Sequence, residues 1–296
     1  MKEIESVPVF YREEMSVDSH GESPSASKPQ RVVFDWQQFG LPIEIKSFQA
    51  ATAADLCEVH CSTYVKRVLA GQLANGHGNR NKGVSRSCLL TVGSFTAAAE
   101  EAASNGCVAC SPTSGFHHAG YQVGGGYCTF NGLMAAAGKF VRRGWRVAII
   151  DCDAHFGDGT QDIIDRKQLG YWINHWTYGR DFSMSFDWER FERKIRSYFE
   201  SFVHESEFGR RIVFYQAGAD VSVDDPLGPG SSGMYDSEMR QRDRFVFELC
   251  RNHKVPVVWN LAGGYQRDEF GEIPKVLELH RATMEECARC FVGRVD

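Results

Sequence analysis

The stretch Arg146-Val-Ala-Ile-Ile-Asp-Cys-Asp-Ala-His-Phe-Gly-Asp-Gly159 joins an apolar run to a cluster of polar side chains. The apolar run predicts a buried strand that ends at about Ile150. Successive side chains alternate along an extended chain, so Asp151, Asp153 and His155 are expected to point to the same side. Two carboxylates and an imidazole that face one point favour a bound cation. A plain strand followed by an Asp- and Gly-rich turn would give the same local pattern.

Helical and extended patterns alternate along the chain. They predict helices over residues 52–69, 92–103, 132–143, 188–203, 237–252 and 274–291, and strands over 7–11, 106–110, 146–150, 211–216 and 255–261. This alternation is typical of an α/β fold, so we expect a three-layer αβα arrangement with a mainly parallel central sheet. No internal repeat divides the chain, which predicts a single catalytic domain over residues 1–296. Residues 18–29 are the one linker-like stretch.

Composition narrows the class of protein. The 33 basic and 38 acidic residues leave a net charge of -5. This charge does not favour binding to nucleic acid or membranes, so we expect neither as a partner. No leader-like segment and no window of about 18 apolar residues is visible, so we expect a cytoplasmic protein. The ten cysteines fit a reducing compartment better than a disulfide framework. Cys107-x-x-Cys110 and Cys287-x-x-Cys290 could form a structural zinc site, but the first pair falls inside a predicted strand.

Polar residues follow four of the predicted strands. His117 and His118 come after 106–110, Asp153 and His155 after 146–150, Asp220 after 211–216, and Tyr265 after 255–261. In open α/β sheets ligands bind outside the carboxyl ends of the strands. We therefore expect these side chains to share one rim of the sheet.

Three of these residues are candidate metal ligands. Asp153, His155 and Asp220 offer two carboxylates and an imidazole and leave a coordination position open for water, as in catalytic divalent sites. Water on such a metal loses its proton near neutral pH. In isolation Asp220 could equally be a turn carboxylate, so the prediction depends on the joint arrangement.

The remaining polar residues have the chemistry of amide hydrolysis. His118 can take a proton and return it to a leaving amine, while His117 adds positive charge or a hydrogen bond. Asp151 and Asp158 are the available carboxylates for holding the two histidines. Tyr265, on a glycine-rich turn, can donate a hydrogen bond to the oxyanion that forms when an amide is attacked.

Six blocks of the sequence also match a known pattern. They are Val59-His-Cys-Ser-Thr-Tyr-Val65, Gly115-Phe-His-His-Ala119, Gly126-Tyr-Cys-Thr-Phe-Asn131, Asp151-x-Asp-x-His-x-Gly-Asp-Gly159, Gly218-Ala-Asp220 with Asp225-Pro-Leu227, and Gly263-Gly-Tyr265. In this order they resemble the signature blocks of the histone deacetylase and acetylpolyamine amidohydrolase superfamily. The resemblance covers most of the chain. It implies an arginase-like α/β fold with one zinc ion (Zn2+) per chain on Asp153, His155 and Asp220.

The resemblance also implies a function. It identifies a zinc-dependent amidohydrolase that removes an acetyl or other acyl group from an acyl-lysine side chain or from an acylated small amine, by attack of zinc-bound water. The roles implied are general base and acid for His118, its electrostatic partner for His117, and carbonyl polariser for Tyr265. Asp151 and Asp158 would orient the two histidines. Gly126, Tyr127 and Leu227 would line the substrate tunnel, and a potassium ion (K+) could bind near Asp151 and Asp153.

The chain departs from the family pattern at several points. Phe156 stands where the family usually has a second histidine, and Tyr127 where it commonly has phenylalanine. The usual Pro-Gly-Thr-Gly loop is not evident between Trp172 and Asp187, so this pocket wall is unassigned. No acidic residue occurs from 59 to 99, a stretch that instead contains Lys66, Arg67, Arg80, Lys82 and Arg86. These basic residues either form a solvated face or disfavour cationic substrates such as histone tails and polyamines.

Two other functions remain open from the sequence. A ureohydrolase of the arginase group would share the fold and the Asp-Ala-His run, but should carry a second full metal set and has no need of Tyr265. A catalytically silent acyl-lysine-binding protein could retain the same pocket. The physiological substrate, the preferred acyl chain and the oligomeric state are not determined by the sequence.

Overall fold

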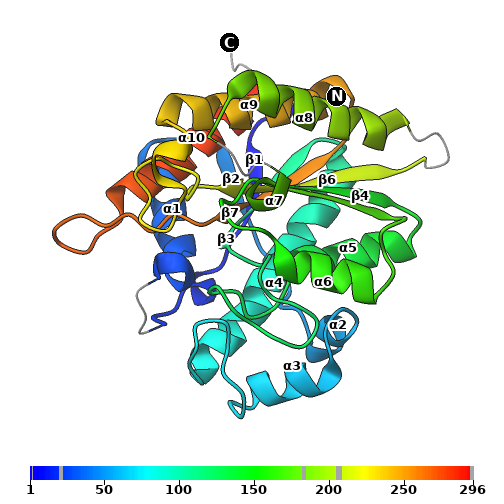
Figure 1. The fold of residues 1–296 in the computed structure, drawn as a ribbon, viewed down its shortest axis with the longest axis vertical. Helices are drawn as coiled ribbons and strands as arrows, with labels where there is room; N and C mark the ends of the chain where they lie inside the picture. The colour runs from blue at the N-terminus through cyan, green and yellow to red at the C-terminus, as the bar shows by residue number, and fades with distance from the viewer. Residues whose placement is uncertain (2, 20–22, 182–184, 205–208, 294–296) are drawn as a thin grey trace.

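The computed structural model describes residues 1, 3–19, 23–181, 185–204 and 209–293, and its centre is a seven-stranded parallel sheet (Figure 1). The strands lie in the order β2-β1-β3-β7-β6-β4-β5. Their bounds are β1 Val7–Phe10, β2 Ile43–Lys46, β3 Val108–Ser114, β4 Arg146–Asp151, β5 Ile173–Thr177, β6 Arg211–Gly218 and β7 Val257–Ala262. All pairings among them are parallel. The predicted α/β class is confirmed.

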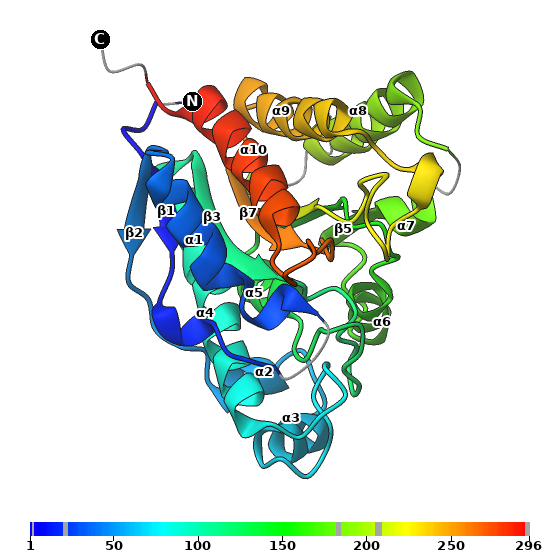
Figure 2. The same ribbon diagram turned by 90° about the vertical axis from the view of Figure 1, so that its left-hand side faces the viewer.

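Helices cover both faces of this sheet. Their bounds are α1 Lys28–Gln38, α2 Ala53–Cys57, α3 Ser62–Leu69, α4 Lys82–Asn105, α5 Gly132–Arg142, α6 Asp158–Arg166, α7 Tyr178–Asp181, α8 Trp188–His204, α9 Asp236–Asn252 and α10 Pro274–Phe291. Helices α1, α8, α9 and α10 share one core, whereas α2 to α6 share the other. Figure 2 shows α1 beside α10 along the first face. No helix within the described ranges is long and apolar enough to cross a membrane.

The buried strands show why the sheet needs both layers. In β4, Ala148 and Ile150 pack into the first core, while Val147 and Ile149 pack into the second. Because side chains alternate along a strand, an apolar run such as this one requires cover on both faces. Because all the strands run in the same direction, their carboxyl ends lie at one edge of the sheet.

The helical stretch predicted over 52–69 is present but is divided into two helices, because the chain breaks between α2 and α3. The amide of Cys61 donates to the carbonyl of Tyr121 at 2.7 Å, and His60 Nδ1 donates to the carbonyl of Gly120 at 2.8 Å. The amide of Cys61 thus bonds to a distant loop instead of within a helix, although the amide of His60 still donates to the carbonyl of Leu56 at 2.8 Å. Periodicity could not reveal the break, since the competing partners lie about 60 residues away in sequence.

Other differences come from short or polar elements. The expected linker over 18–29 runs into α1, whose Val32, Val33 and Trp36 are buried. Helix α4 begins ten residues before the predicted 92, and α6 and strands β2 and β5 were not predicted. Strand β5 lies at the edge of the sheet and includes Asn174 and His175, so it lacks the apolar run that marks the central strands.

Asn131 joins several segments beneath the rim of the sheet. It is fully buried and caps α5, since its Oδ1 accepts from the amide of Met134 at 3.0 Å. Its Nδ2 donates to the carbonyl of Ala119 and to Thr160 Oγ1, both at 3.0 Å, and its amide donates to His60 Nε2 at 2.9 Å. One side chain therefore fixes the loop after the tandem histidines to α5 and α6.

We expect Asn131→Ala to lower the free energy of unfolding by about 3 kcal/mol, because it removes a helix cap and leaves buried polar groups without partners. Asn81→Ala is the matched control: Asn81 is half-buried and also caps a helix, through an exposed hydrogen bond from the amide of Gly83 at 2.8 Å. Asn81→Ala should lower the free energy of unfolding by about 1 kcal/mol. Denaturant unfolding measures both values. Equal losses in the two variants would contradict the role given to Asn131.

Candidate metal centre and active site

Four neighbouring strands deliver the candidate residues to one edge of the sheet. Strands β3, β7, β6 and β4 are adjacent, and each is followed at its carboxyl end by one of the predicted polar groups. The groups are His117 and His118 after β3, Tyr265 after β7, Asp220 after β6, and Asp153 and His155 after β4. The tertiary structure thus brings together residues that are up to about 150 positions apart in sequence.

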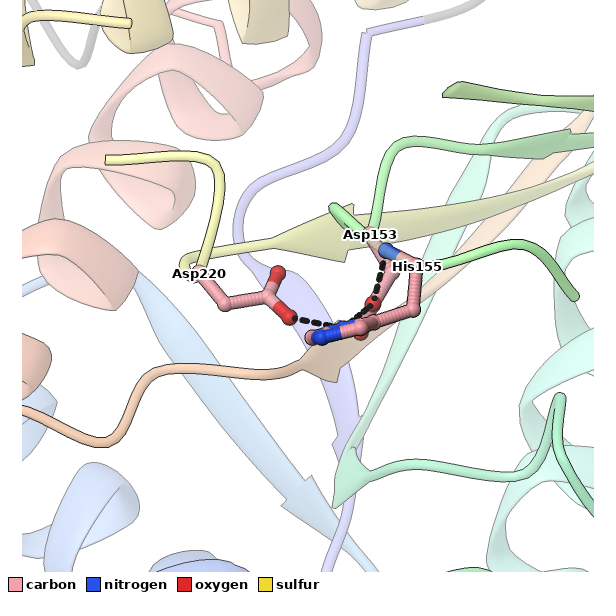
Figure 3. Close-up of side chains that lie close together, drawn as sticks. All are labelled: Asp153, His155 and Asp220. Carbon is pink, nitrogen blue, oxygen red and sulfur yellow. Dashed lines mark hydrogen bonds and ion pairs between the residues drawn. The ribbon is translucent and has the colours of Figure 1, made fainter. Parts of the chain in front are cut away.

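Asp153, His155 and Asp220 converge on one point (Figure 3). His155 Nδ1 lies 3.0 Å from Asp153 Oδ1 and 3.0 Å from Asp220 Oδ2. One ligand atom from each residue lies within 4.8 Å of the others, and among the described residues no other His, Cys, Asp or Glu set of three or more does so. The cysteines of the two Cys-x-x-Cys pairs do not form such a group.

This donor set fits a divalent cation. Burial and the neighbouring Asp153 raise the pKa of Asp220 to about 7, because two buried carboxylates repel each other. Both carboxylates in turn raise the pKa of His155 to about 11. The site therefore favours positive charge, which a metal ion would supply in place of the imidazole proton. The His155 side chain is 40% exposed, which leaves the site open on one side.

Each histidine of the tandem pair is held by its own carboxylate. His117 Nδ1 donates to Asp151 Oδ2 at 2.8 Å, and His118 Nδ1 donates to Asp158 Oδ1 at 2.6 Å. The His118 ring centroid is 4.1 Å from that of His117 and 5.9 Å from that of His155. His117 Nε2 lies 3.6 Å from Asp153 Oδ1, whereas His118 presents its Nε2 on the side away from Asp158.

The two histidines differ in their surroundings. Burial lowers the pKa of His117, but Asp151 and Asp153 outweigh this effect and raise it to about 9. Burial and the neighbouring charge of His117 lower the pKa of His118. The pair thus combines a protonated imidazole below the site with a neutral imidazole at its surface.

Tyr265 and two of the predicted tunnel residues, Gly126 and Tyr127, lie near this group. The rings of Tyr127 and Tyr265 are 5.7 Å apart, and burial raises the pKa of Tyr265, so its hydroxyl remains a proton donor. Gly126 has φ +51°, and a Cβ added there would lie 2.4 Å from the His118 ring. Leu227 is 46% exposed, and its amide donates to Asp225.

Backbone strain accumulates at the same site. Phe116, directly before the tandem histidines, has φ +98°, and Tyr127 has φ +63°. The amide of Phe116 donates to Cys128 Sγ at 3.2 Å, and the amide of Tyr127 donates to the carbonyl of Gly76 at 3.0 Å. Non-glycine residues hold such conformations only where their surroundings enforce them, and these positions cluster at functional sites.

Sequence reasoning missed three residues that support the site. Gln216 Nε2 donates to Asp151 Oδ1 at 2.8 Å. The Asp225 carboxylate accepts from the amides of Leu227 at 3.0 Å and Tyr265 at 2.7 Å. Lys28, inside the expected linker, is fully buried near the Tyr265 turn. The Asp-Pro-Leu block offered a signal for Asp225, whereas no sequence signal singled out the other two.

The structure shows where the residues that depart from the family pattern lie. Phe156 packs under the guanidinium of Arg180 at 5.2 Å and is not part of the metal group. The unassigned wall between 172 and 187 includes β5 and α7, and residues 182–184 lie outside the described residues. Next to His118 and Asp158, a cavity of about 550 Å³ is also lined by Arg67 of the basic stretch.

Comparison with known proteins identifies the family. The histone deacetylase domain model matches residues 27–183, which is more than half of the chain. The chain therefore belongs to the histone deacetylase domain family and is a hydrolase of the deacetylase type. This family is in general zinc-dependent, in agreement with the donor set described above.

Individual relatives agree with this assignment. An uncharacterised protein of Picosynechococcus sp. is 28% identical over 270 residues, covering 82% of this chain and 86% of the relative. Histone deacetylase 2 of Arabidopsis thaliana is 29% identical over 181 residues, 55% of this chain and 46% of that protein. Acetylpolyamine amidohydrolase 2 of Pseudomonas aeruginosa is 53% identical over 55 residues, 18% of this chain and 16% of that protein.

Solved structures share the fold. An acetylpolyamine aminohydrolase from Burkholderia pseudomallei superposes with a TM-score of 0.73 at 16% identity, covering 97% of this chain and 100% of that chain. The HD domain of HDA15 superposes with a TM-score of 0.74 at 18% identity, covering 99% of this chain and 91% of that chain.

We expect zinc to stabilise the protein through this site. At a free zinc concentration about a hundredfold above Kd, binding to the folded state alone adds about 2.7 kcal/mol, or roughly 5 °C or more in Tm. Asp220→Asn should abolish this rise while leaving the metal-free protein as stable or slightly more stable, since one of two buried like charges is removed. The exposed Asp224 provides the control substitution Asp224→Asn. A zinc-dependent rise that survives in Asp220→Asn would place the metal elsewhere.

Proposed function

We propose that this protein is a zinc-dependent amidohydrolase that removes an acetyl or other acyl group from an acyl-lysine side chain or from an acylated small amine. The observation that carries the proposal is the metal-ligand group of Asp153, His155 and Asp220 with two carboxylate-bound histidines beside it. One zinc ion per chain would occupy this group. When bound, it would polarise the amide carbonyl and make water more acidic.

The chain's own residues move the protons and hold the substrate. His118, neutral and held by Asp158, accepts a proton from water and delivers it to the departing amine. His117, held by Asp151, contributes positive charge beside it. Tyr265 donates a hydrogen bond to the oxygen that becomes negative during the reaction.

Further roles follow from the same proposal. Gly126, Tyr127 and Leu227 line the path of the acyl-amine chain. A potassium ion near Asp151 and Asp153 would add positive charge at the ends of β4 and is a separate prediction. The match to the deacetylase family favours this chemistry over ureohydrolase chemistry.

The decisive experiment pairs metal analysis with turnover. Protein freed of metal and reconstituted with zinc should contain about one ion per chain and hydrolyse acyl-lysine peptides or acylated small amines. A panel of both substrate types with short and long acyl chains identifies the preferred one. Two bridged metal ions per chain would support a ureohydrolase instead. A zinc-loaded protein that binds the panel without turnover would be a silent acyl-lysine-binding protein.

Tyr265→Phe should lower kcat by about a hundredfold or more with zinc content and fold preserved, because one oxyanion donor is lost. Tyr235→Phe, which changes a tyrosine that is 66% exposed, is the matched control and should have no effect. His118→Ala should be at least as damaging as Tyr265→Phe. Turnover that is unchanged in Tyr265→Phe would remove this hydroxyl from the mechanism.

The charge around the cavity beside His118 bears on the substrate. Asp158 is engaged by His118, and Asp162 forms an ion pair with Arg166 at 2.6 Å. Arg67 is exposed and has no ion-pair partner among the described residues, so it is a local cation on a lining whose other charged groups are Asp158, Asp162 and Arg166. An unpaired cation beside the substrate path disfavours a cationic flank of the substrate and favours a neutral or acidic one.

We therefore expect kcat/KM to be about threefold to fivefold higher for acyl-lysine flanked by acidic residues than for the same residue flanked by lysines, the range of a single exposed charge pair. The gap should narrow as salt is raised from low to high concentration. Arg67→Gln should reduce the preference, whereas Arg86→Gln, in the same basic stretch but outside the cavity lining, should not. Preference for the basic peptide would restore a histone-like or polyamine substrate.

A further inference from the structure

Lys28 connects the ends of two central strands from beneath the site. It is the first residue of α1, and its side chain is fully buried. Its ammonium donates to Ser114 Oγ at 3.0 Å and to the carbonyl of Gly263. Ser114 is the last residue of β3, and Gly263 is the first residue after β7.

A buried ammonium in this position is costly for folding. Its two hydrogen-bond partners are neutral, and the nearby carboxylates of Asp220, Asp225 and Asp153 act on it through space. Burial lowers the pKa of Lys28 to about 8, although these carboxylates oppose the change. A leucine or methionine would fill such a site without the desolvation penalty of a charge. The presence of lysine therefore indicates a role other than filling the core.

The turn that Lys28 contacts leads directly to Tyr265. Gly263 has φ +49°, and a Cβ added there would lie 2.1 Å from the carboxyl carbon of Asp220. The backbone of the turn therefore packs directly against Asp220, a candidate metal ligand, and only glycine fits at position 263. Lys28 holds its beginning at the carbonyl of Gly263, and Asp225 holds its end at the amide of Tyr265. The Lys28 ammonium also lies 5.8 Å from the centre of the Tyr265 ring.

We propose that Lys28 is a positioning residue, which fixes the Gly263–Tyr265 turn so that the Tyr265 hydroxyl is held beside the Asp153, His155 and Asp220 group. This inference rests on the amidohydrolase function proposed above. The hydrogen bonds of Lys28 go to Ser114 and Gly263, and not to the metal group or to the residues assigned to the substrate path. It acts through the position of Tyr265.

A purely structural role makes a different prediction. If Lys28 only tied α1 to the sheet, its loss would destabilise the fold without any dependence on Tyr265. Arg146 provides the comparison, because it is a buried cation at the opposite, amino end of β4, with a hydrogen bond to Asn174 Oδ1 at 2.9 Å.

The test is a double-mutant cycle. Lys28→Met, which keeps length but removes charge and donors, should lower kcat about tenfold or more with KM and zinc content nearly unchanged, because small displacements of an oxyanion donor have effects on this scale. In a Tyr265→Phe background the same substitution should lower kcat less than about twofold, since the two residues act as a unit. Lys28→Arg should retain most of the activity. An equal loss in both backgrounds would overturn the proposal.

Hydrogen exchange gives a readout that does not depend on turnover. Amides between 263 and 266 should exchange about tenfold faster or more in Lys28→Met than in the unmodified protein, because a held turn becomes free to open. Arg146→Met should leave these amides unchanged. If Lys28→Met does not fold, Ser114→Ala removes one of the two acceptors and should give a smaller change in the same amides. Unchanged exchange overturns the proposal, whereas absent turnover in the unmodified protein overturns only the proposed amidohydrolase function.

Discussion

The rest of the site depends on two carboxylates, Asp153 and Asp220, that the fold buries side by side. Neither tolerates this arrangement without compensating positive charge, and the His155 imidazole between them supplies it when no metal is bound. A divalent cation would satisfy the same demand more fully, because it carries two positive charges instead of one and leaves the imidazole neutral. The sheet holds the carboxylates together, since they follow the adjacent parallel strands β4 and β6.

The electrostatics of the tandem histidines follows from this arrangement. The carboxylates that surround His117 favour its protonated form, and that charge helps to keep His118 neutral. Two identical side chains next to each other in sequence thus acquire different protonation through their neighbours. Tyr265 completes the group from β7, and its turn is constrained by Asp220 on one side and by Lys28 and Asp225 at its two ends.

Strong apolar runs and clustered polar residues made much of this predictable. The run at 146–150 predicted β4 closely, because a strand buried on both faces has a continuous apolar pattern. The parallel sheet then implied that the polar residues after β3, β4, β6 and β7 share an edge. Edge strand β5 and the break between α2 and α3 were missed for a common reason. Their conformations depend on contacts with segments that are distant in sequence, and local periodicity cannot predict such contacts.

The sequence by itself determined the class of fold, the family resemblance and the identity of the candidate metal ligands and histidines, because these depend on local patterns and on residue chemistry. Only the tertiary structure decided which carboxylate each histidine uses, where Arg67 stands relative to His118, and that Lys28, from an apparent linker, lies buried under the Tyr265 turn. The physical reason is that burial and hydrogen-bond partnership arise from the packing of distant segments. Neither is a property of a residue's neighbours in sequence.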